Sequence, residues 1–462
     1  MLTGPECDTC KQLHPIWLMI AAAMPGLVWA ADCGTQAEVC GSWAGTRQPV
    51  FLIWDGMILE QYPGKLDIDS LVAYMKGVAS RVFSRPAASP AERERLEAEQ
   101  KERRACLHAA AGPEAAITSN VTHTAASIAV SLGVGGGVSG GATGGGGRGP
   151  PLLLELSEAE VRCGAPLPAT VKLVAMLLHS AGYVVLRGAM PDATVAALQA
   201  SLSDAVAASV ERAARGEVEE GGVGLHACDA NGTVCYGGWH KAHRFKLAPV
   251  LAGPFASDAV LRNPYVMPAL DRAFVSSPAV LQAVASDCNV HGSTTQPPHR
   301  DVSFGMAGRG DEGVSAAGAR RPTVLLANIA LQDVGGDVDG PIELWPGTQA
   351  HELPGLEATL TGTPEDGANV EAEAVCALLP SVRVTMRAGD VLLRDPVMVH
   401  RGTPRLRAGA RLLATIIYRA RDYTGTWDYL NVNQYGRHPL HGFSQLSDAA
   451  RALIPPPREP AG

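Results

Sequence analysis

A glycine-rich run divides the chain into separate folding problems. Glycine supplies 11 of the 17 residues from 133 to 149. Such a stretch has too little side chain to bury, and ordering it would cost more backbone entropy than packing returns. We therefore expect a flexible tether here. Because 462 residues exceed one ordinary domain, we expect a folded unit on each side.

A charged segment extends this tether on its N-terminal side. Pro86 and Pro90 open it, and residues 91–104 balance five glutamates against five lysines and arginines at helical spacing. That pattern is typical of a solvated helix. The predicted organisation is an N-terminal unit over 1–80, a charged helical and glycine-rich linker over 81–150, and a second unit over 151–450.

Composition and charge narrow the class of protein. A net charge of -8 offers no basic footprint for a nucleic-acid backbone. The sequence shows no apolar run of the roughly 18 to 20 residues that a membrane-spanning helix needs. Ten scattered cysteines do not indicate a disulfide framework. We expect a protein without nucleic-acid partner or membrane span, cytoplasmic by default, or targeted to an organelle or the secretory route if the N-terminus is incomplete.

The second unit begins with helical patterns and continues with strands. A helix is predicted over 170–181, and another begins with Asp192 as its N-cap and runs to about residue 215. The sequence GYVVLRG between them reads as a strand. From about residue 284 short β-rich runs alternate with Gly, Pro and Asp turns, as in VLLANIALQDV and VRVTMRAGDVLL. This order favours an α+β unit with an antiparallel barrel or jelly roll.

Two of these β-rich segments carry side chains that suit a metal. They read QPPHRDVSFG and DPVMVHRGTPRLRAGARLLATIIY. Residues i and i+2 of an extended strand point to the same face. His299 and Asp301 are therefore predicted to aim an imidazole and a carboxylate at one point, while Arg300 points away. His400 is the candidate third ligand from a distant strand.

Two histidines and one carboxylate on one face of an iron leave three positions open, enough for a 2-oxo acid and dioxygen. The oxo acid also needs a cation for its far carboxylate. Arg411 lies eleven residues after His400, at the start of RLLATIIY. A guanidinium there suits a bidentate pair with a carboxylate. Arg405 and Arg407 lie nearer, in a Pro/Gly turn, and we expect them to be exposed.

A lone His-x-Asp or a lone buried histidine is usually structural, so the combination carries the interpretation. The surrounding segments resemble the phytanoyl-CoA dioxygenase family over roughly residues 165–425. The similar segments are GYVVLRGAMP, HRFKLAPVLAGPFASDAVLRNPYVMPAL, ANIALQDVGGDVDGPIELWPGTQAHE and RAGDVLLRDPVMVHRGTPR.

This resemblance implies a double-stranded β-helix, which is a jelly roll, with flanking helices. It implies Fe(II) held by His299, Asp301 and His400, with 2-oxoglutarate on Arg411 and dioxygen as the oxidant. The implied reaction hydroxylates a small organic or lipid-like substrate and releases succinate and CO2. Because related halogenases lack the carboxylate at the position of Asp301, its presence favours hydroxylation.

The N-terminal unit contains a Cys-x-x-Cys pair. Cys7 and Cys10 precede KQLHPIW, and a helix N-terminus there would stabilise a thiolate on Cys7. The segments CDTCKQLHPIW, LVWAADC, QPVFLIWDG and ILEQYPGKLDIDSLVAYMKG resemble thioredoxin and protein disulfide isomerase modules. Only six residues precede Cys7, so the resemblance implies a partial thioredoxin-like α/β segment with thiol-bearing protein partners. A zinc site and a signal peptide are the alternatives.

Two rival functions follow from the same sequence. The chain could be a thioredoxin-like disulfide oxidoreductase with a non-catalytic jelly-roll binding domain, or a binding module alone. The complete set of three metal-ligating residues and Arg411 favours the oxygenase, since a decayed site would be expected to lose one of them. Succinate release that depends on iron and 2-oxoglutarate distinguishes the oxygenase from both rivals.

Overall fold

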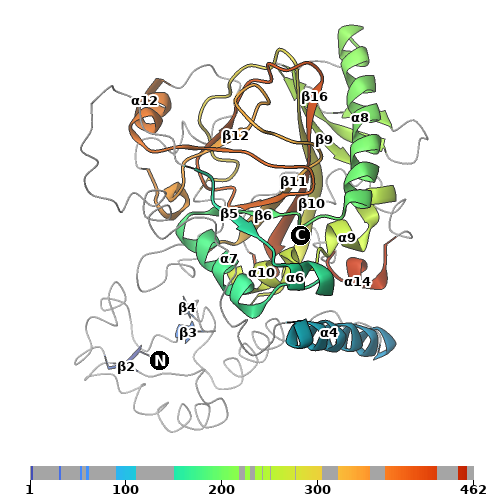
Figure 1. Cartoon of the computed structure of the whole chain (residues 1–462). Coiled ribbons are helices and arrows are strands. Elements are labelled where there is room, and N and C mark those ends of the chain that lie inside the picture. The colour runs from blue at the N-terminus through green and yellow to red at the C-terminus, as the bar shows by residue number, and fades with distance from the viewer. Residues whose placement is uncertain are drawn as a thin grey trace, which may run out of the picture. The chain divides into compact units, whose positions relative to one another are not determined.

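The computed structural model of the chain is shown in Figure 1. It describes residues 2–3, 31–32, 52–54, 59–61, 90–110, 150–217, 224–228, 235–241, 243–249, 251–275, 277–303, 321–353, 370–423 and 446–454. The chain divides into two compact units. The first contains strands β1 to β4, and the second contains every described element from α4 onward.

The described residues of the N-terminal unit form four short strands in two pairs. These are β1 (Leu2–Thr3) parallel to β2 (Ala31–Asp32), and β3 (Leu52–Trp54) antiparallel to β4 (Leu59–Gln61). The candidate redox residues Cys7 and Cys10 lie outside the described residues. The thioredoxin-like interpretation of this unit therefore rests on the sequence.

The charged segment before the glycine-rich run forms the expected helix, α4 (Pro90–Ala110). Arg95 and Arg103 each lie 4.0 Å from Glu99, at the i, i+4 spacing of helical ion pairs. All three side chains are exposed, so these pairs add little to stability. The described charged residues of this helix form a solvated face, as the charge pattern predicts.

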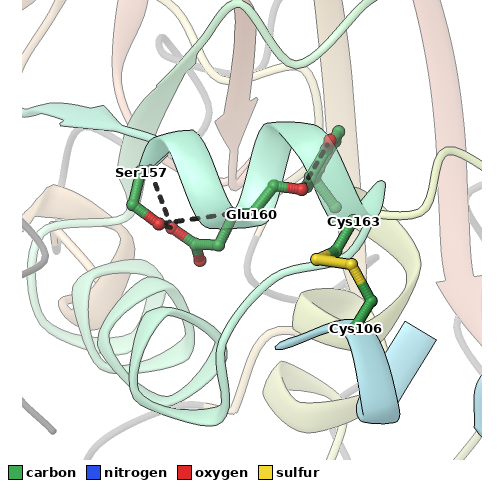
Figure 2. Close-up of a disulfide and its surroundings, with 5 residues drawn as sticks. Cys106, Ser157, Glu160 and Cys163 are labelled. Atoms are coloured by element: carbon green, nitrogen blue, oxygen red, sulfur yellow. Dashed lines mark hydrogen bonds between the residues drawn. A yellow bond between two sulfur atoms is a disulfide. The ribbon is translucent and has the colours of Figure 1, made fainter. Parts of the chain in front are cut away.

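A disulfide links α4 to α6 (Glu158–Cys163), as Figure 2 shows. Cys106 and Cys163 are 57 residues apart in sequence. Beside the bond, Leu107 packs with Ala165 in a small apolar cluster. A capping box closes the start of α6, because Ser157 accepts from the amide of Glu160 while the Glu160 carboxylate accepts from the amide of Ser157. The cysteine spacing does not predict this pairing.

Nine strands form the main sheet of the second unit, and all neighbours run antiparallel except the first two. Most are strongly apolar because both of their faces are covered; all seven residues of β11, for example, are buried. In spatial order the strands are β5 (Leu153–Glu155), β6 (Tyr183–Arg187), β14 (Val391–Arg394), β11 (Val324–Ala330), β16 (Ala410–Ala420), β10 (Ala279–Val290), β9 (Arg244–Pro249), β8 (Cys235–Lys241) and β7 (Gly224–Cys228).

A second sheet has three short antiparallel strands. In spatial order they are β13 (Val382–Val384), β12 (Ile342–Leu344) and β15 (His400–Gly402). With the main sheet they give the jelly-roll-like arrangement that the sequence pattern predicts. Residues of both sheets meet near β15, where a core cluster continues from the main sheet through Leu344 and Val384.

Helices cover the main sheet (Figure 1). The helices contribute Leu178, Leu198 and Leu270 to the principal core cluster, where all three side chains are fully buried. The remaining elements are α7 (Pro168–Ser180), α8 (Asp192–Ala214), η2 (Gly253–Ala256), α9 (Asp258–Leu261), α10 (Val266–Ala273), η3 (Thr348–Ala350), α12 (Val370–Leu378) and α14 (Asp448–Arg451).

The start of α8 differs from the prediction by one residue. Pro191 occupies the N-cap with φ -62° and ψ 139°, and no side chain caps the helix. Asp192 is instead the first helical residue, where its charge complements the helix dipole.

By length and composition α8 is also the one helix of the described chain that could cross a membrane. Its buried residues Leu198 and Leu202 belong to the principal core.

Candidate metal centre

Two histidines of the centre are paired with each other through their backbones. His299 follows β10 in an extended segment, and His400 is the first residue of β15. Each amide donates to the carbonyl of the other residue at 2.9 Å. In such an antiparallel pair the two side chains lie on one face. Their imidazole centroids are accordingly 4.5 Å apart.

The carboxylate of Asp301 joins the two rings. Its Oδ1 lies 3.9 Å from Nε2 of His299, and its Oδ2 lies 3.4 Å from Nε2 of His400. One ligand atom from each residue lies within 4.8 Å of the others. The amide of Asp301 donates to the carbonyl of Pro396 at 3.0 Å, which ties its segment to the loop before β15. The structure thus brings the three predicted ligands together.

Arg300, between the two ligands in sequence, points away from them, as predicted. Its guanidinium donates to the carbonyls of Thr348 and His351 at 3.0 Å, and also to that of Val397. These carbonyls belong to the loop after β12 and to the segment before His400. Arg300 therefore fixes the backbone around the centre.

Both rings turn the same nitrogen inward. Nδ1 of His299 lies 2.9 Å from the carbonyl of Pro297, and Nδ1 of His400 lies 3.0 Å from that of Met398. Because a carbonyl can only accept, Nδ1 of each ring carries a proton, and Nε2 is the nitrogen that each ring turns toward the centre. A backbone partner on the outer nitrogen is the usual way in which proteins orient a metal-binding imidazole.

The electrostatics favour the protonation states that a metal needs. Burial, and after it the neighbouring His400, lower the pKa of His299 to about 3. Burial by itself raises the pKa of the Asp301 carboxyl, but His400 and Arg394 outweigh it and hold that pKa well below its usual range. His299 is therefore neutral and Asp301 ionised. Two imidazole nitrogens and a carboxylate suit non-haem Fe(II), so these residues fit such an ion.

Arg394, at the end of β14, is a member of the centre that the sequence analysis missed. Its Nη2 donates to Oδ2 of Asp301 at 2.8 Å, and its Nε donates to Oδ1 of Asn328 at 3.1 Å. The one available signal was a buried arginine at the end of the apolar run VLLR, six residues before His400.

The predicted anchor Arg411 lies at the start of β16, opposite Asn289 of β10. It is buried, and it donates to the carbonyls of Gly340 and Asp287 at 2.8 and 3.3 Å and to the amide oxygen of Asn289 at 3.2 Å. Burial lowers its pKa to about 10, which still leaves it charged at neutral pH.

A second buried guanidinium belongs to the same region. Arg244 of β9 donates to the carbonyls of Thr294 and Thr403 at 2.6 and 2.9 Å. Burial and then the charge of Arg411 lower its pKa to about 9. A side chain at Gly402 would clash with this guanidinium, so the glycine two residues after His400 makes room for it. These two buried cations outnumber Asp287, the nearby carboxylate that acts on both, and together they create a potential that suits an anion.

The expectation that Arg405 is exposed is wrong. Arg405 is buried, and its Nη1 lies 3.2 Å from Oδ1 of Asp339, with which it also forms a β-bridge. The carboxylate compensates the buried charge, which the turn-like sequence did not reveal. Arg407 is exposed as expected, with 63% of its side chain accessible, and its Nε lies 2.8 Å from the same carboxylate.

Comparison with known proteins gives a match to one family. The model of the family described as phytanoyl-CoA dioxygenase matches residues 178–411. The matched segment has 234 of the 462 residues, just over half of the chain. The match includes His299, Asp301, His400 and Arg411. No curated protein matches the chain.

Solved structures with a similar fold are distant. The non-heme alpha ketoglutarate dependent epimerase SnoN from nogalamycin biosynthesis is 19% identical over 55% of this chain and 82% of its own, with a TM-score of 0.35. The carbocyclase SnoK from the same biosynthesis is 18% identical over 58% and 90%, with a TM-score of 0.38. HygX from Streptomyces hygroscopicus, with nickel, 2-oxoglutarate and hygromycin B bound, is 16% identical over 56% and 89%, with a TM-score of 0.35. Similarity at this level does not define a reaction.

Proposed function

Because this chain belongs to the phytanoyl-CoA dioxygenase family, we propose that it hydroxylates a small organic or lipid-like substrate. The family uses Fe(II), 2-oxoglutarate and dioxygen, and the chain is an oxygenase-type enzyme of that kind. The proposed reaction inserts one oxygen atom of O2 into a substrate C–H bond and the other into succinate. 2-Oxoglutarate supplies two electrons and loses CO2, so atoms and electrons balance.

The convergence of three side chains carries this proposal. His299, Asp301 and His400 present two imidazole nitrogens and one ionised carboxylate to one point. When bound there, Fe(II) supplies the redox chemistry that activates dioxygen. His299, Asp301 and His400 would hold the metal from one side, which would leave the other side for the two co-substrates. The carboxylate of Asp301 also occupies the place that a halide would need, which favours hydroxylation over halogenation.

Arg411 is the proposed anchor of 2-oxoglutarate. Its three hydrogen-bond acceptors are two carbonyls and an amide oxygen, which orient the guanidinium without cancelling its charge. A carboxylate that reaches it gains a charge-assisted pair in a buried region. Neighbouring Arg244 adds to the positive potential there.

The test is succinate release by the full chain. Purified protein is supplied with Fe(II), 2-oxoglutarate and air, together with metabolite extracts as a source of substrate. We expect succinate to form only when all three components are present, and one extract component to gain a single oxygen atom. A folded, iron-loaded protein that releases no succinate with any extract would refute the proposal. Halogenated or epimerised products with succinate release would refute only the hydroxylation.

The N-terminal Cys-x-x-Cys is the basis of a second proposal, thiol–disulfide exchange with protein partners. It is supported by the helix-start context of Cys7 and Cys10 in the sequence. Reduction of a disulfide-bonded protein by the full chain, compared with its Cys7→Ser variant, tests it. Exchange that needs Cys7, in a chain that releases no succinate, would favour the disulfide oxidoreductase with a non-catalytic jelly roll.

A further inference from the structure

Arg394 is the single charged residue of β14, and it points into the interior of the second unit. The strand reads VLLR, and all four of its residues are buried. Removing a guanidinium from water is unfavourable unless partners compensate the lost hydration. Its position therefore depends on the acceptors that it meets.

Those acceptors lie in two different directions. Nη2 of Arg394 donates to Oδ2 of Asp301 at 2.8 Å, while Nε donates to Oδ1 of Asn328 at 3.1 Å. A guanidinium is planar and its N–H bonds point in fixed directions, so the two contacts together define its orientation. Arg394 is thus held on the sheet by Asn328 and in turn holds one oxygen of the candidate metal ligand.

The hydrogen bonds continue across the main sheet. Asn328 of β11 donates from Nδ2 to the hydroxyl of Thr415 on β16 at 2.8 Å. That hydroxyl donates to Oδ2 of Asp287 on β10 at 2.9 Å. Lys246 of β9 lies 3.7 Å from the other oxygen of Asp287. Five adjacent strands therefore contribute to one polar chain that ends on Asp301, and this chain fixes the rotamer of Arg394.

A carboxylate can bind a metal through one oxygen or through two. The two-oxygen mode would use a coordination position that 2-oxoglutarate and dioxygen need, since together they require three. Oδ2 of Asp301 already accepts a short charge-assisted bond from Arg394, which engages one of its lone pairs, and the same oxygen lies 3.4 Å from Nε2 of His400. Oδ1, which faces Nε2 of His299, has its closest ion-pair partner at 3.9 Å.

We infer that Arg394 is a positioning residue that limits Asp301 to one-oxygen coordination and so keeps a position open for 2-oxoglutarate. This inference rests on the proposed function. Loss of Arg394 frees Oδ2, and Asp301 then takes up the metal through both oxygens. Metal binding survives this change, whereas chelation of 2-oxoglutarate is weakened. A purely structural role would weaken both together.

The experiment measures the two steps separately in the full chain. Co(II) titration reports metal binding without turnover. Anaerobic titration of the Fe(II)-loaded protein with 2-oxoglutarate, followed by the visible charge-transfer absorption of the chelate, reports the second step. The variants are Arg394→Met, which removes every donor, and Arg394→Lys, which keeps the charge but loses the fork. Thermal melting confirms that each variant is folded.

Arg187→Met is the matched control. Arg187 of β6 forms an ion pair at 2.5 Å with Asp390, so it is another largely buried arginine–carboxylate pair of the same sheet. Arg187 and Asp390 both lie outside the candidate metal centre. We expect this variant to bind Co(II) and 2-oxoglutarate as the unmodified chain does, and any loss in it measures the general cost of removing such a pair.

We expect Arg394→Met to bind Co(II) within about threefold of the unmodified chain and to need at least about tenfold more 2-oxoglutarate, as for a lost charge-assisted bond. The 2-oxoglutarate requirement of Arg394→Lys should lie between those of Arg394→Met and the unmodified chain. An unchanged 2-oxoglutarate requirement overturns the inference, and so does a parallel loss of Co(II) binding in a folded variant. If Arg394→Met does not fold, Arg394→Lys decides by the same criteria. Failure of the unmodified chain to bind Co(II) refutes the proposed function itself.

Discussion

His299 and His400 are joined by a reciprocal pair of backbone hydrogen bonds, each 2.9 Å long. The distance between the two imidazoles is therefore set by main-chain pairing and not by the packing of the rings. The segment after β10 is brought into register with β15 by a contact that any amino acid except proline could make on its amide side. The side chains at these positions are consequently free to serve chemistry.

Replacing His400 by alanine should separate activity from folding. The backbone bridge remains in His400→Ala, so we expect a melting temperature within a few degrees of the unmodified chain, as for a loss of about 1 kcal/mol. Succinate formation should fall below detection because one of three ligands is gone. Succinate assay and thermal melting check this together. Turnover at the original rate would exclude His400 as a ligand.

Replacing Arg411 by alanine should raise the 2-oxoglutarate requirement. Loss of a buried charge-assisted pair costs about 2 to 4 kcal/mol, which corresponds to roughly 30- to 700-fold in affinity. The measurement is succinate release over a range of 2-oxoglutarate concentrations. Metal binding should be unchanged, because none of the three proposed metal ligands is among the hydrogen-bond partners of Arg411.

Arg405→Ala is the control for that variant. Arg405 is also buried, but its charge is matched by Asp339. Its loss leaves a buried carboxylate with the exposed Arg407 as its remaining ion-pair partner, and we expect a lower melting temperature with an unchanged 2-oxoglutarate requirement. The reverse result, with Arg405→Ala raising that requirement and Arg411→Ala not, would reassign the anchor.

Reduction of the Cys106–Cys163 disulfide should destabilise the second unit. Closing a loop of 57 residues is worth up to about 4 kcal/mol through the entropy of the unfolded chain. Cys106→Ser should lower the denaturant midpoint of the full chain, and a reductant should lower the midpoint of the unmodified chain equally. Adding reductant to the variant should cause no further shift. A midpoint indifferent to both changes would contradict this.

The free thiols of Cys288 and Cys376 should resist alkylation. Burial raises the pKa of both Cys288 and Cys376 to about 12. Because the folded pKa exceeds the usual value of 9.0, stability from these groups is complete below pH 9 and declines as pH rises toward 12. At pH 8 we expect labelling by iodoacetamide to be at least about 100-fold slower than in the unfolded chain. Peptide mapping by mass spectrometry checks each site.

The sequence predicted what depends on local spacing. The i, i+2 rule placed His299 and Asp301 on one face, and apolar β-runs indicated the strand of His400. The helices over 168–180 and 192–214 followed from periodicity and end within two residues of the predicted limits. Each of these features is encoded within one strand or one helix.

Features that join distant segments escaped prediction. The bond from Arg394 to Asp301 spans 93 residues and needs the strand order β14-β11-β16-β10, which no local pattern contains. The burial of Arg405 depends on Asp339, 66 residues away. Ten cysteines likewise allow many pairings, so the link between Cys106 and Cys163 follows only from the fold.

That link also makes the glycine-rich run part of a covalent ring. Residues 133–149 lie between Cys106 and Cys163, so both ends of the run lead to the same cross-linked pair of helices. A protease that cuts the run leaves one particle, which separates into two fragments on a gel only after reduction. Insertions, deletions or a graft of foreign sequence within the run would change the size of a closed loop without releasing α4, so we expect the chain to tolerate such changes in length.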